Sequence, residues 1–339
     1  MPDAFLKLSA TDRHEVLALA ADRAGRPAYL LEKDVWVVWT LSAMFSAPFG
    51  DHLVFKGGTS LSKAYGAIRR FSEDVDLTYD IRQIAPDLTE NGTRLMPPSR
   101  SQQRRWTDTI RERLTGWLES TALDALNRAI AAENVPARAR RGEKPDTLVV
   151  EYEGSSEGHS YVAPVVLLEF GARSTGEPAD RMNVGCDAAA HLPDVTFPTA
   201  SPRVMHVERT FWEKATAIHV ACSGGRANWD RFARHWYDLV QLDRKGHAER
   251  ALVDRELAKA VAEHKANFFR ETVRATGEVI DYGLAVGGQL RLVPTGEVLQ
   301  ALRADYGKMI DGGLFFDVPA SFESVIAQCK DIEDRANQR

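Results

Sequence analysis

The chain has 339 residues, of which 44% are hydrophobic and 27% charged, so it has ample apolar material for one large domain or two of ordinary size. Its formal net charge of -5 argues against wholesale coating of nucleic acid, although it allows a local basic face. The 3 cysteines are scattered without metal-ligand spacing, and no stretch approaches the roughly 20 apolar residues that span a bilayer, so we expect a cytoplasmic protein with no membrane partner.

Two helices are expected before Pro48. Apolar residues at helical spacing predict the first, which ends before Pro27. The second covers 28–45 and is densely apolar, as is typical of a buried helix. Its charged triplet at 32–34 (Glu-Lys-Asp) is expected at the solvent-exposed edge of the helix, and the alternative is a place at the edge of a catalytic site.

A glycine pair after a short strand predicts a phosphate-binding turn. The strand at 53–55 leads into the pair, and a helix is expected over 60–68. Glycines let a backbone come close to phosphate, and the start of a helix offers free N–H groups to it. The residues expected to contact a nucleotide here are Lys56, Gly57, Gly58, Thr59 and Ser60.

Two carboxylates follow on the strand expected over 71–79. Asp74 and Asp76 flank one apolar residue, so strand geometry places both carboxylates on the same face. Two close carboxylates suit Mg²⁺, which prefers oxygen ligands and shares them with substrate phosphates. A phosphate cradle beside a carboxylate pair is what metal-assisted nucleotidyl transfer requires. The alternative is a solvated strand beside an ordinary glycine turn.

The region 100–145 is rich in arginine. A long amphipathic helical region is expected over 101–133, in which arginines interleave with Trp106 and Trp117. It is either a solvated face or a contact surface for RNA, on which arginines act together with exposed aromatic rings. The basic stretch at 136–145 is expected to be a mobile loop and a second candidate RNA contact.

Strands are expected at 148–152 and 161–170, and Glu169 lies near the end of the second. A carboxylate near an attacking hydroxyl can accept its proton if its pKa is tuned. The alternative for Glu169 is an acid in solvent at the end of a strand.

Beyond residue 200 the pattern is mostly helical. Helices are expected at 207–221 and 231–242; the first contains Lys214 and the second contains Asp238. Taken alone, each of these residues is expected at the surface or in a buried structural ion pair.

The order of the motifs resembles the signature of the polymerase-β-like nucleotidyltransferases: a hydrophobic residue, a glycine pair, a helix and Asp-x-Asp. The segments KGGTSLSKAYG and RFSEDVDL resemble more specifically the AbiEii/AbiGii toxin family, which includes the MenT toxins. EKDVWVVW, TFWEK, YDL and DYGKM extend the resemblance over most of the chain, although the gap between Gly58 and Asp74 is at the long end of the pattern.

The resemblance implies an α+β fold. A polymerase-β-like core, made of a mixed sheet with helices, would occupy 1–200 with N-terminal helices. The basic helical insertion expected at about 100–145 within it is not part of the resemblance. A mainly helical C-terminal domain would occupy 201–339. The nucleotide would lie where both halves contribute residues.

The resemblance also implies the roles of individual residues. Asp74 and Asp76 would bind Mg²⁺, and Glu169 would be the third carboxylate, as general base or metal ligand. Lys214 would hold the triphosphate of the incoming nucleotide as a compact point charge. Asp238 would orient the nucleotide or a neighbouring cation.

The implied function is that of a toxin of an AbiE-type toxin–antitoxin pair, which moves a nucleoside monophosphate from an NTP to RNA, with a tRNA 3′ end as the expected acceptor. A cognate antitoxin would restrain it, by binding or by modifying a hydroxyl such as that of Ser60 or Thr59. One alternative is a transferase of the same fold that nucleotidylates a protein or a small molecule. Another is a non-catalytic nucleotide-binding module, against which the intact glycines and aspartates argue.

Overall fold

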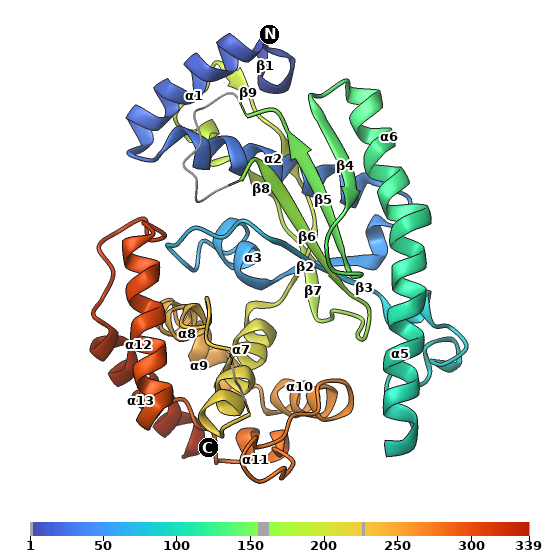
Figure 1. The fold of residues 1–339 in the computed structure, drawn as a ribbon, viewed down its shortest axis with the longest axis vertical. Helices are drawn as coiled ribbons and strands as arrows, with labels where there is room; N and C mark the ends of the chain where they lie inside the picture. Colours follow the sequence, from blue (N-terminus) through green and yellow to red (C-terminus); the bar gives the residue numbers. More distant parts are fainter. Residues whose placement is uncertain (1–2, 155–162, 226–227, 339) are drawn as a thin grey trace. The chain divides into compact units, whose positions relative to one another are not determined.

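The computed structural model describes residues 3–154, 163–225 and 228–338 (Figure 1). It has an α+β fold with a mixed sheet and a largely helical C-terminal part, which confirms the expected fold class. The chain divides into two compact units. The first comprises Met1–Ala64, Ser72–Leu95 and Arg105–Met205, and the second comprises Tyr65–Phe71, Met96–Arg104 and His206–Arg339. Two short excursions of the N-terminal half therefore belong to the C-terminal unit, while the predicted boundary at residue 200 stays a prediction.

The main sheet lies in the first unit. Its strands are β2 (Leu53–Lys56), β3 (Val75–Tyr79), β4 (Ala137–Arg141), β5 (Thr147–Tyr152), β6 (Val165–Gly171), β7 (Ala179–Arg181) and β11 (Arg203–Met205). Their order is β4-β5-β6-β3-β2-β11-β7, with β3 parallel to β6, β2 parallel to β11 and the other neighbours antiparallel. Short ladders pair β1 (Asp3–Ala4) with β9 (Val195–Thr196) and β8 (Val184–Gly185) with β10 (Thr199–Ala200). Residues 161 and 162 of the expected strand at 161–170 lie outside the described residues.

Helices complete the first unit. They are α1 (Ala10–Ala24), α2 (Ala28–Ser46), α3 (Gly57–Lys63), α4 (Ile81–Ile84), α5 (Arg100–Trp117), whose first turn belongs to the second unit, and α6 (Leu123–Glu133). Helix α2 packs against the sheet (Figure 1). There Trp36 stacks on Tyr152 of β5 with ring centroids 5.0 Å apart. Helix α1 in turn packs along α2.

The charged triplet at the start of α2 is buried, so the expectation of a solvent-exposed edge is wrong. Its charges are paired inside the unit. Lys33 forms an ion pair with Glu73. The carboxylate of Asp34 lies 2.6 Å from the ammonium group of Lys63 and accepts a hydrogen bond of 2.6 Å from the backbone N–H of Asp187. Buried charges are tolerated when partners and hydrogen bonds compensate them, and sequence alone does not reveal such partners.

The connection between the glycine turn and the aspartates differs from the predicted helix at 60–68 and strand at 71–79. Helix α3 starts at Gly57 and ends at Lys63, and β3 starts only at Val75. The backbone of 69–71 is bound instead to a distant segment. Phe71 N–H donates to the carbonyl of Leu314 at 2.7 Å, and Phe316 N–H donates to that of Arg69 at 3.1 Å. These tertiary bonds hold the segment between α3 and β3, and the local sequence pattern does not predict them.

One of the two alternatives for the arginine-rich helical region loses support, and the expectation of a mobile loop at 136–145 is wrong for its first part. Trp106 is only 2% exposed, and Trp117 stacks on Tyr79 with ring centroids 4.1 Å apart, so these rings do not form an exposed aromatic surface. The first part of the stretch at 136–145 is a strand: β4 pairs with β5 from Ala137 to Arg141, and only the residues after it form a turn. Its arginines are paired with acids, namely Arg138 and Arg140 with Glu151 and Arg141 with Glu119.

The second unit is helical. Its helices are α7 (Val207–Cys222), α8 (Arg234–Arg244), α9 (His247–Val253), α10 (Arg255–Phe268), α11 (Tyr282–Val286), α12 (Gly296–Asp311) and α13 (Phe322–Asn337). Two buried indoles fix α7 and α8. Trp212 donates to the carbonyl of Ala251 at 2.9 Å, and Trp236 donates to that of Leu292 at 2.7 Å. Within the described residues, no helix combines the length and the apolar content that crossing a membrane requires.

Candidate active site

The glycine turn lies directly against one of the aspartates. Gly57 follows β2 with φ of 77°, a conformation that favours glycine. A Cβ atom at Gly57 would overlap with the carboxylate of Asp76. Glycine is therefore required here twice, once by the backbone and once by the close approach of a carboxylate.

Strand register places Asp76 and Glu169 on one face of the sheet, and Asp74 lies one residue before the start of β3. Asp76 is opposite Lys56 of β2 and Glu169 of β6, and Asp74 comes two residues before Asp76. Val75 and Leu77, whose side chains point to the other face, are fully buried. The predicted grouping of Asp76 with Glu169 on neighbouring strands is thus seen in the backbone pairing.

The hydroxyls of Thr59 and Ser60 form hydrogen bonds with neighbouring residues of the same segment. Thr59 Oγ1 donates to the carbonyl of Asp74 at 2.6 Å and lies 3.0 Å from Ser72 Oγ. Ser60 Oγ donates to the carbonyl of Gly57 at 3.0 Å. Both residues are buried, so the hypothesis that an antitoxin modifies either hydroxyl would require this segment to open. The bond from Thr59 instead ties α3 to the residue that begins the aspartate motif.

Glu169 has a cationic partner. Lys144, in the turn between β4 and β5, donates to Glu169 Oε1 at 3.0 Å. This hydrogen bond is the main cause of the raised pKa of Lys144, and the charge of Asp74 contributes in the same direction. An exposed ammonium group thus lies in the electrostatic reach of two predicted site carboxylates. Sequence reasoning missed Lys144, because the basic composition of the hairpin that carries it predicts a mobile loop.

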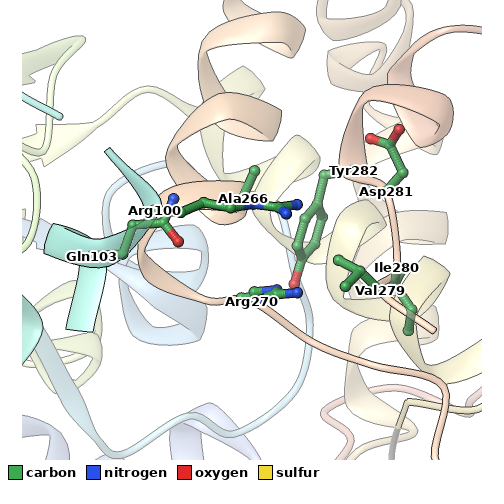
Figure 2. Close-up of a pocket in the computed structure, with 8 residues that line it drawn as sticks. All are labelled: Arg100, Gln103, Ala266, Arg270, Val279, Ile280, Asp281 and Tyr282. Atoms are coloured by element: carbon green, nitrogen blue, oxygen red, sulfur yellow. The ribbon is translucent and has the colours of Figure 1, made fainter. Parts of the chain in front are cut away.

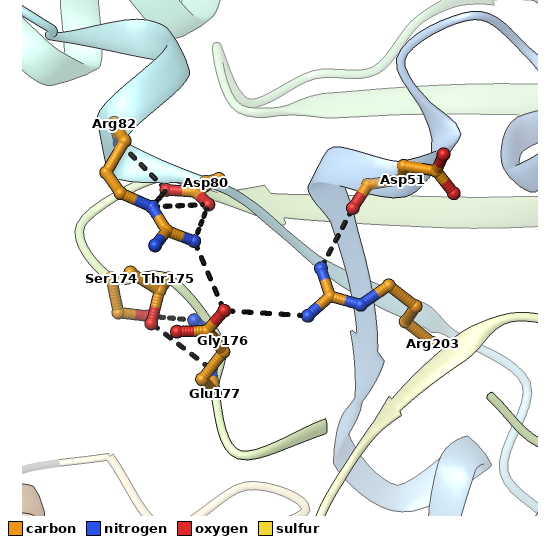
Figure 3. A network of polar contacts seen from close by, with 8 residues as sticks. All are labelled: Asp51, Asp80, Arg82, Ser174, Thr175, Gly176, Glu177 and Arg203. Carbon is orange, nitrogen blue, oxygen red and sulfur yellow. Dashed lines mark hydrogen bonds and ion pairs between the residues drawn. The ribbon is translucent and has the colours of Figure 1, made fainter. Parts of the chain in front are cut away.

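The far end of β3 is anchored by a polar network (Figure 3). Asp80 binds Arg82, Arg82 lies 3.2 Å from Glu177, and Glu177 lies 3.6 Å from Arg203. Arg203 also donates to the backbone carbonyl of Asp51 at 2.8 Å, just before β2. The network connects the end of β3 with the start of β2, which supports the register that aligns Lys56 with Asp76.

The second unit holds a buried ionic cluster of Arg70, Lys214 and Asp238. Arg70 binds Asp238 through two hydrogen bonds of 2.8 Å each, and Lys214 Nζ lies 2.8 Å from Asp238 Oδ2. Asp238 is 0% exposed and Lys214 is 7% exposed. Lys214 of α7 and Asp238 of α8 are therefore in contact, as in the alternative of a buried structural ion pair, and Arg70 is the third member of the cluster.

In this cluster, burial and neighbouring charges shift the pKa values of Asp238 and Lys214 in opposite directions. Burial alone would raise the pKa of Asp238, but the charges of Arg70 and Lys214 outweigh it and hold that pKa well below its usual range. Burial lowers the pKa of Lys214, and Asp238 opposes that shift. Burial also keeps the pKa of His235 well below its usual value, and its Nδ1 has no hydrogen-bond partner among the described residues. His235 is thus a neutral neighbour of the cluster.

Asp305, in the segment DYGKM, fixes the start of α8. Its carboxylate accepts hydrogen bonds from the backbone N–H groups of Arg231 at 2.8 Å and of Ala233 at 2.7 Å. Arg231 has φ of 55°, which is uncommon outside glycine. Asp305 therefore holds the helix that carries Asp238 and has a structural role that the sequence pattern alone does not assign.

Comparison with protein families finds the model described as "Nucleotidyl transferase AbiEii toxin, Type IV TA system", which matches residues 39–328. Among solved structures, the chain is similar to MenT4, a nucleotidyltransferase toxin from Mycobacterium tuberculosis H37Rv. The identity is 18% and the TM-score is 0.48, over 95% of this chain and 90% of that chain. Comparison with curated protein sequences finds no significant match. Because the family match spans most of its length, the chain belongs to the AbiEii family of nucleotidyltransferase toxins of type IV toxin–antitoxin systems.

Proposed function

We propose that this nucleotidyltransferase moves a nucleoside monophosphate from an NTP to an RNA acceptor, the 3′ end of a tRNA, in a Mg²⁺-dependent reaction. Family membership supports nucleotidyl transfer. The observation that supports Mg²⁺-dependent phosphate chemistry is the contact between Gly57 and Asp76, which puts a turn suited to phosphate against a carboxylate suited to a metal. The tRNA acceptor is proposed from the family resemblance.

Magnesium fits the residues of the first unit. Mg²⁺ is commonly held by one or two carboxylates together with water and substrate phosphates, and Asp74 and Asp76 supply two. The part of the chain that the structure describes contains no group of three or more His, Cys, Asp or Glu side chains that could hold a metal ion. The ion, when bound, would neutralise charge on the phosphoryl oxygens.

The residues of the chain would bind and orient the two substrates. Lys56, Gly57, Gly58, Thr59 and Ser60 would receive the triphosphate, largely through backbone N–H groups, since the Thr59 and Ser60 hydroxyls already bond within the turn. Lys214 would add a positive charge for the triphosphate, and Asp238 would hold Lys214 in place. An acceptor oxygen would form a bond to the α-phosphorus, the bond to the bridging oxygen would break, and pyrophosphate would leave. Glu169 would take the acceptor proton.

The partners follow from this reaction. A toxin of a type IV pair has a cognate antitoxin, and buried Thr59 and Ser60 favour restraint by binding over modification of these hydroxyls. NTP and tRNA meet in the cytoplasm, which is where we propose that the chain acts.

A protein or small-molecule acceptor is the second candidate. The pairing of Arg138, Arg140 and Arg141 with acids favours it, because this pairing reduces the basic surface available to RNA. The test is to incubate the chain with each NTP labelled at the α-phosphate, total tRNA and total protein. We expect label in tRNA, and label in protein alone would refute the RNA assignment.

A further inference from the structure

A pocket of about 360 Å³ lies wholly within the second unit (Figure 2). Its walls come from the first turn of α5, the end of α10 and the segment that leads into α11. None of the residues assigned to nucleotidyl transfer lines it. Pockets that bind small ligands have volumes of about 300 Å³ or more, so this pocket is large enough for one.

Two arginines give the pocket its charge. Arg100 comes from α5 and Arg270 follows α10, and Figure 2 shows both side chains reaching toward the ring of Tyr282. Neither guanidinium forms an ion pair within the described residues, unlike Arg113, which is held by Asp87. The acid of the pocket, Asp281, is already engaged, because its carboxylate accepts from the N–H of Gly283 at 2.7 Å.

The helix terminus adds to this positive character. Arg100 is the first residue of α5, which has 18 residues. The first N–H groups of a helix have no partner inside it, and the helix dipole favours an anion there. Arginine and helix N–H groups therefore favour the same ligand chemistry, a phosphate.

The remaining wall is apolar and firmly placed. Tyr282 donates its hydroxyl hydrogen to the carbonyl of Phe269 at 2.7 Å, and burial raises the pKa of Tyr282, so the donor stays protonated. Gln103 of α5 donates to Asn267 of α10 at 3.1 Å, which connects two walls. Val279 presents exposed apolar surface beside them.

We propose that this pocket binds one nucleotide of the RNA acceptor, with its phosphate on Arg100 and Arg270 and its sugar or base against Val279 and Tyr282. This assignment rests on the proposed function, because RNA is the acceptor there. Phosphate contacts carry affinity without reading sequence, so the pocket holds the acceptor and does not select its bases.

The test is direct binding of the full chain to an unmodified tRNA transcript, measured without NTP over a series of salt concentrations. The variant is Arg100→Ala combined with Arg270→Ala. Removal of a charge-assisted hydrogen bond weakens binding by about tenfold or more per arginine. The slope of log affinity against log salt should become shallower by about 0.7 to 0.9 for each phosphate that the variant no longer neutralises.

A matched control is Arg105→Ala combined with Arg274→Ala. These exposed arginines lie in the neighbouring sequence, and their replacement removes the same charge, but they do not line the pocket. The control should bind tRNA with near wild-type affinity and slope. Equal weakening by both double variants, or wild-type binding by the pocket variant, would overturn the assignment.

The two proposals fail in different ways. If the chain transfers nucleotides to tRNA while the pocket variant binds tRNA like wild type, the pocket assignment is wrong and the proposed function stands. If the pocket variant loses tRNA binding while transfer occurs only to protein, the pocket binds RNA that is not the acceptor, and the proposed function is wrong. A wild-type chain that does not bind the transcript refutes the pocket assignment.

Discussion

Replacing Arg70 by alanine tests whether the buried cluster stabilises the second unit. Arg70 donates two hydrogen bonds to Asp238, whose side chain has no exposed surface, and Lys214 supplies the other positive charge. The substitution leaves a buried carboxylate with Lys214 as its cation. Water cannot compensate for the missing guanidinium, so the folded state carries the desolvation of Asp238 without its main compensation.

The expected magnitude is large. Removing one partner of a buried ion pair lowers the free energy of unfolding by about 3–5 kcal/mol. Arg69 is a matched control in the adjacent position, since it is paired with Asp317 but its side chain is 55% exposed. Arg69→Ala should lower that free energy by at most about 1 kcal/mol, because exposed pairs are screened by solvent.

The assay is urea unfolding of the full chain, followed by tryptophan fluorescence. Hydrogen exchange of the peptides that cover α7 and α8 then locates the destabilised region, because these helices carry Lys214 and Asp238. We expect faster exchange there in Arg70→Ala and near wild-type exchange in Arg69→Ala. Equal stability of the two variants would refute the importance assigned to the cluster.

Three further predictions concern the site. Gly57→Ala should reduce transfer by at least about 10²-fold, because the added Cβ would displace the Asp76 carboxylate. Gly66 is the control: it has φ of 54° but open space around it, so Gly66→Ala should be less stable and retain activity. Single-turnover transfer and thermal unfolding of both variants check this. Lys214→Ala should reduce transfer about 10²-fold or more, and a wild-type rate would make Lys214 purely structural. The folded pKa of Asp238 is depressed, so its stabilisation should be present above the ordinary carboxyl pKa of about 3.9 and be lost as pH falls through the folded value. Removal of Arg70 lessens this depression, so unfolding free energies measured from pH 7 downward should fall less below the ordinary carboxyl pKa in Arg70→Ala than in wild type.

Local spacing made part of the site predictable. Gly57 and Asp76 lie within one short stretch, so a turn followed by a strand was enough to predict that they lie close together, whereas Asp74 lies just outside β3. Lys214 and Asp238 could be chosen only through family resemblance, because nothing in the pattern of two helices tells which polar residue faces which.

Long-range partners were not predictable from the pattern. Arg70 lies 168 residues from Asp238 in the sequence. The helix expected before Arg70 ends early, and the backbone on both sides of Arg70 is hydrogen-bonded to 314–316. The only indication in the sequence was an arginine close to the aspartate motif, and the sequence does not show which residue that arginine would pair with. The interpretation of the charged triplet in α2 failed for the same reason, since the residues that neutralise Lys33 and Asp34 lie far along the chain.

Composition was the weakest guide. The basic stretch at 136–145 has the composition of a mobile loop, but its arginines lie on an edge strand and pair with Glu151 and Glu119. Trp106 is spaced like a surface aromatic yet is buried in the packing of α5. A charged side chain is available to a ligand when no other residue of the fold pairs with it. The proposed pocket therefore rests on Arg100 and Arg270 and not on the paired arginines of 136–145.

The most direct test of the central claim is sequencing of tRNA 3′ ends after reaction with each of the four NTPs. Wild-type chain with Mg²⁺ should add nucleotides to the 3′ end, and Asp76→Asn, or wild type in the presence of EDTA, should add none. Unchanged tRNA ends in the wild-type reaction, or addition that survives both the Asp76→Asn substitution and EDTA, would contradict the account.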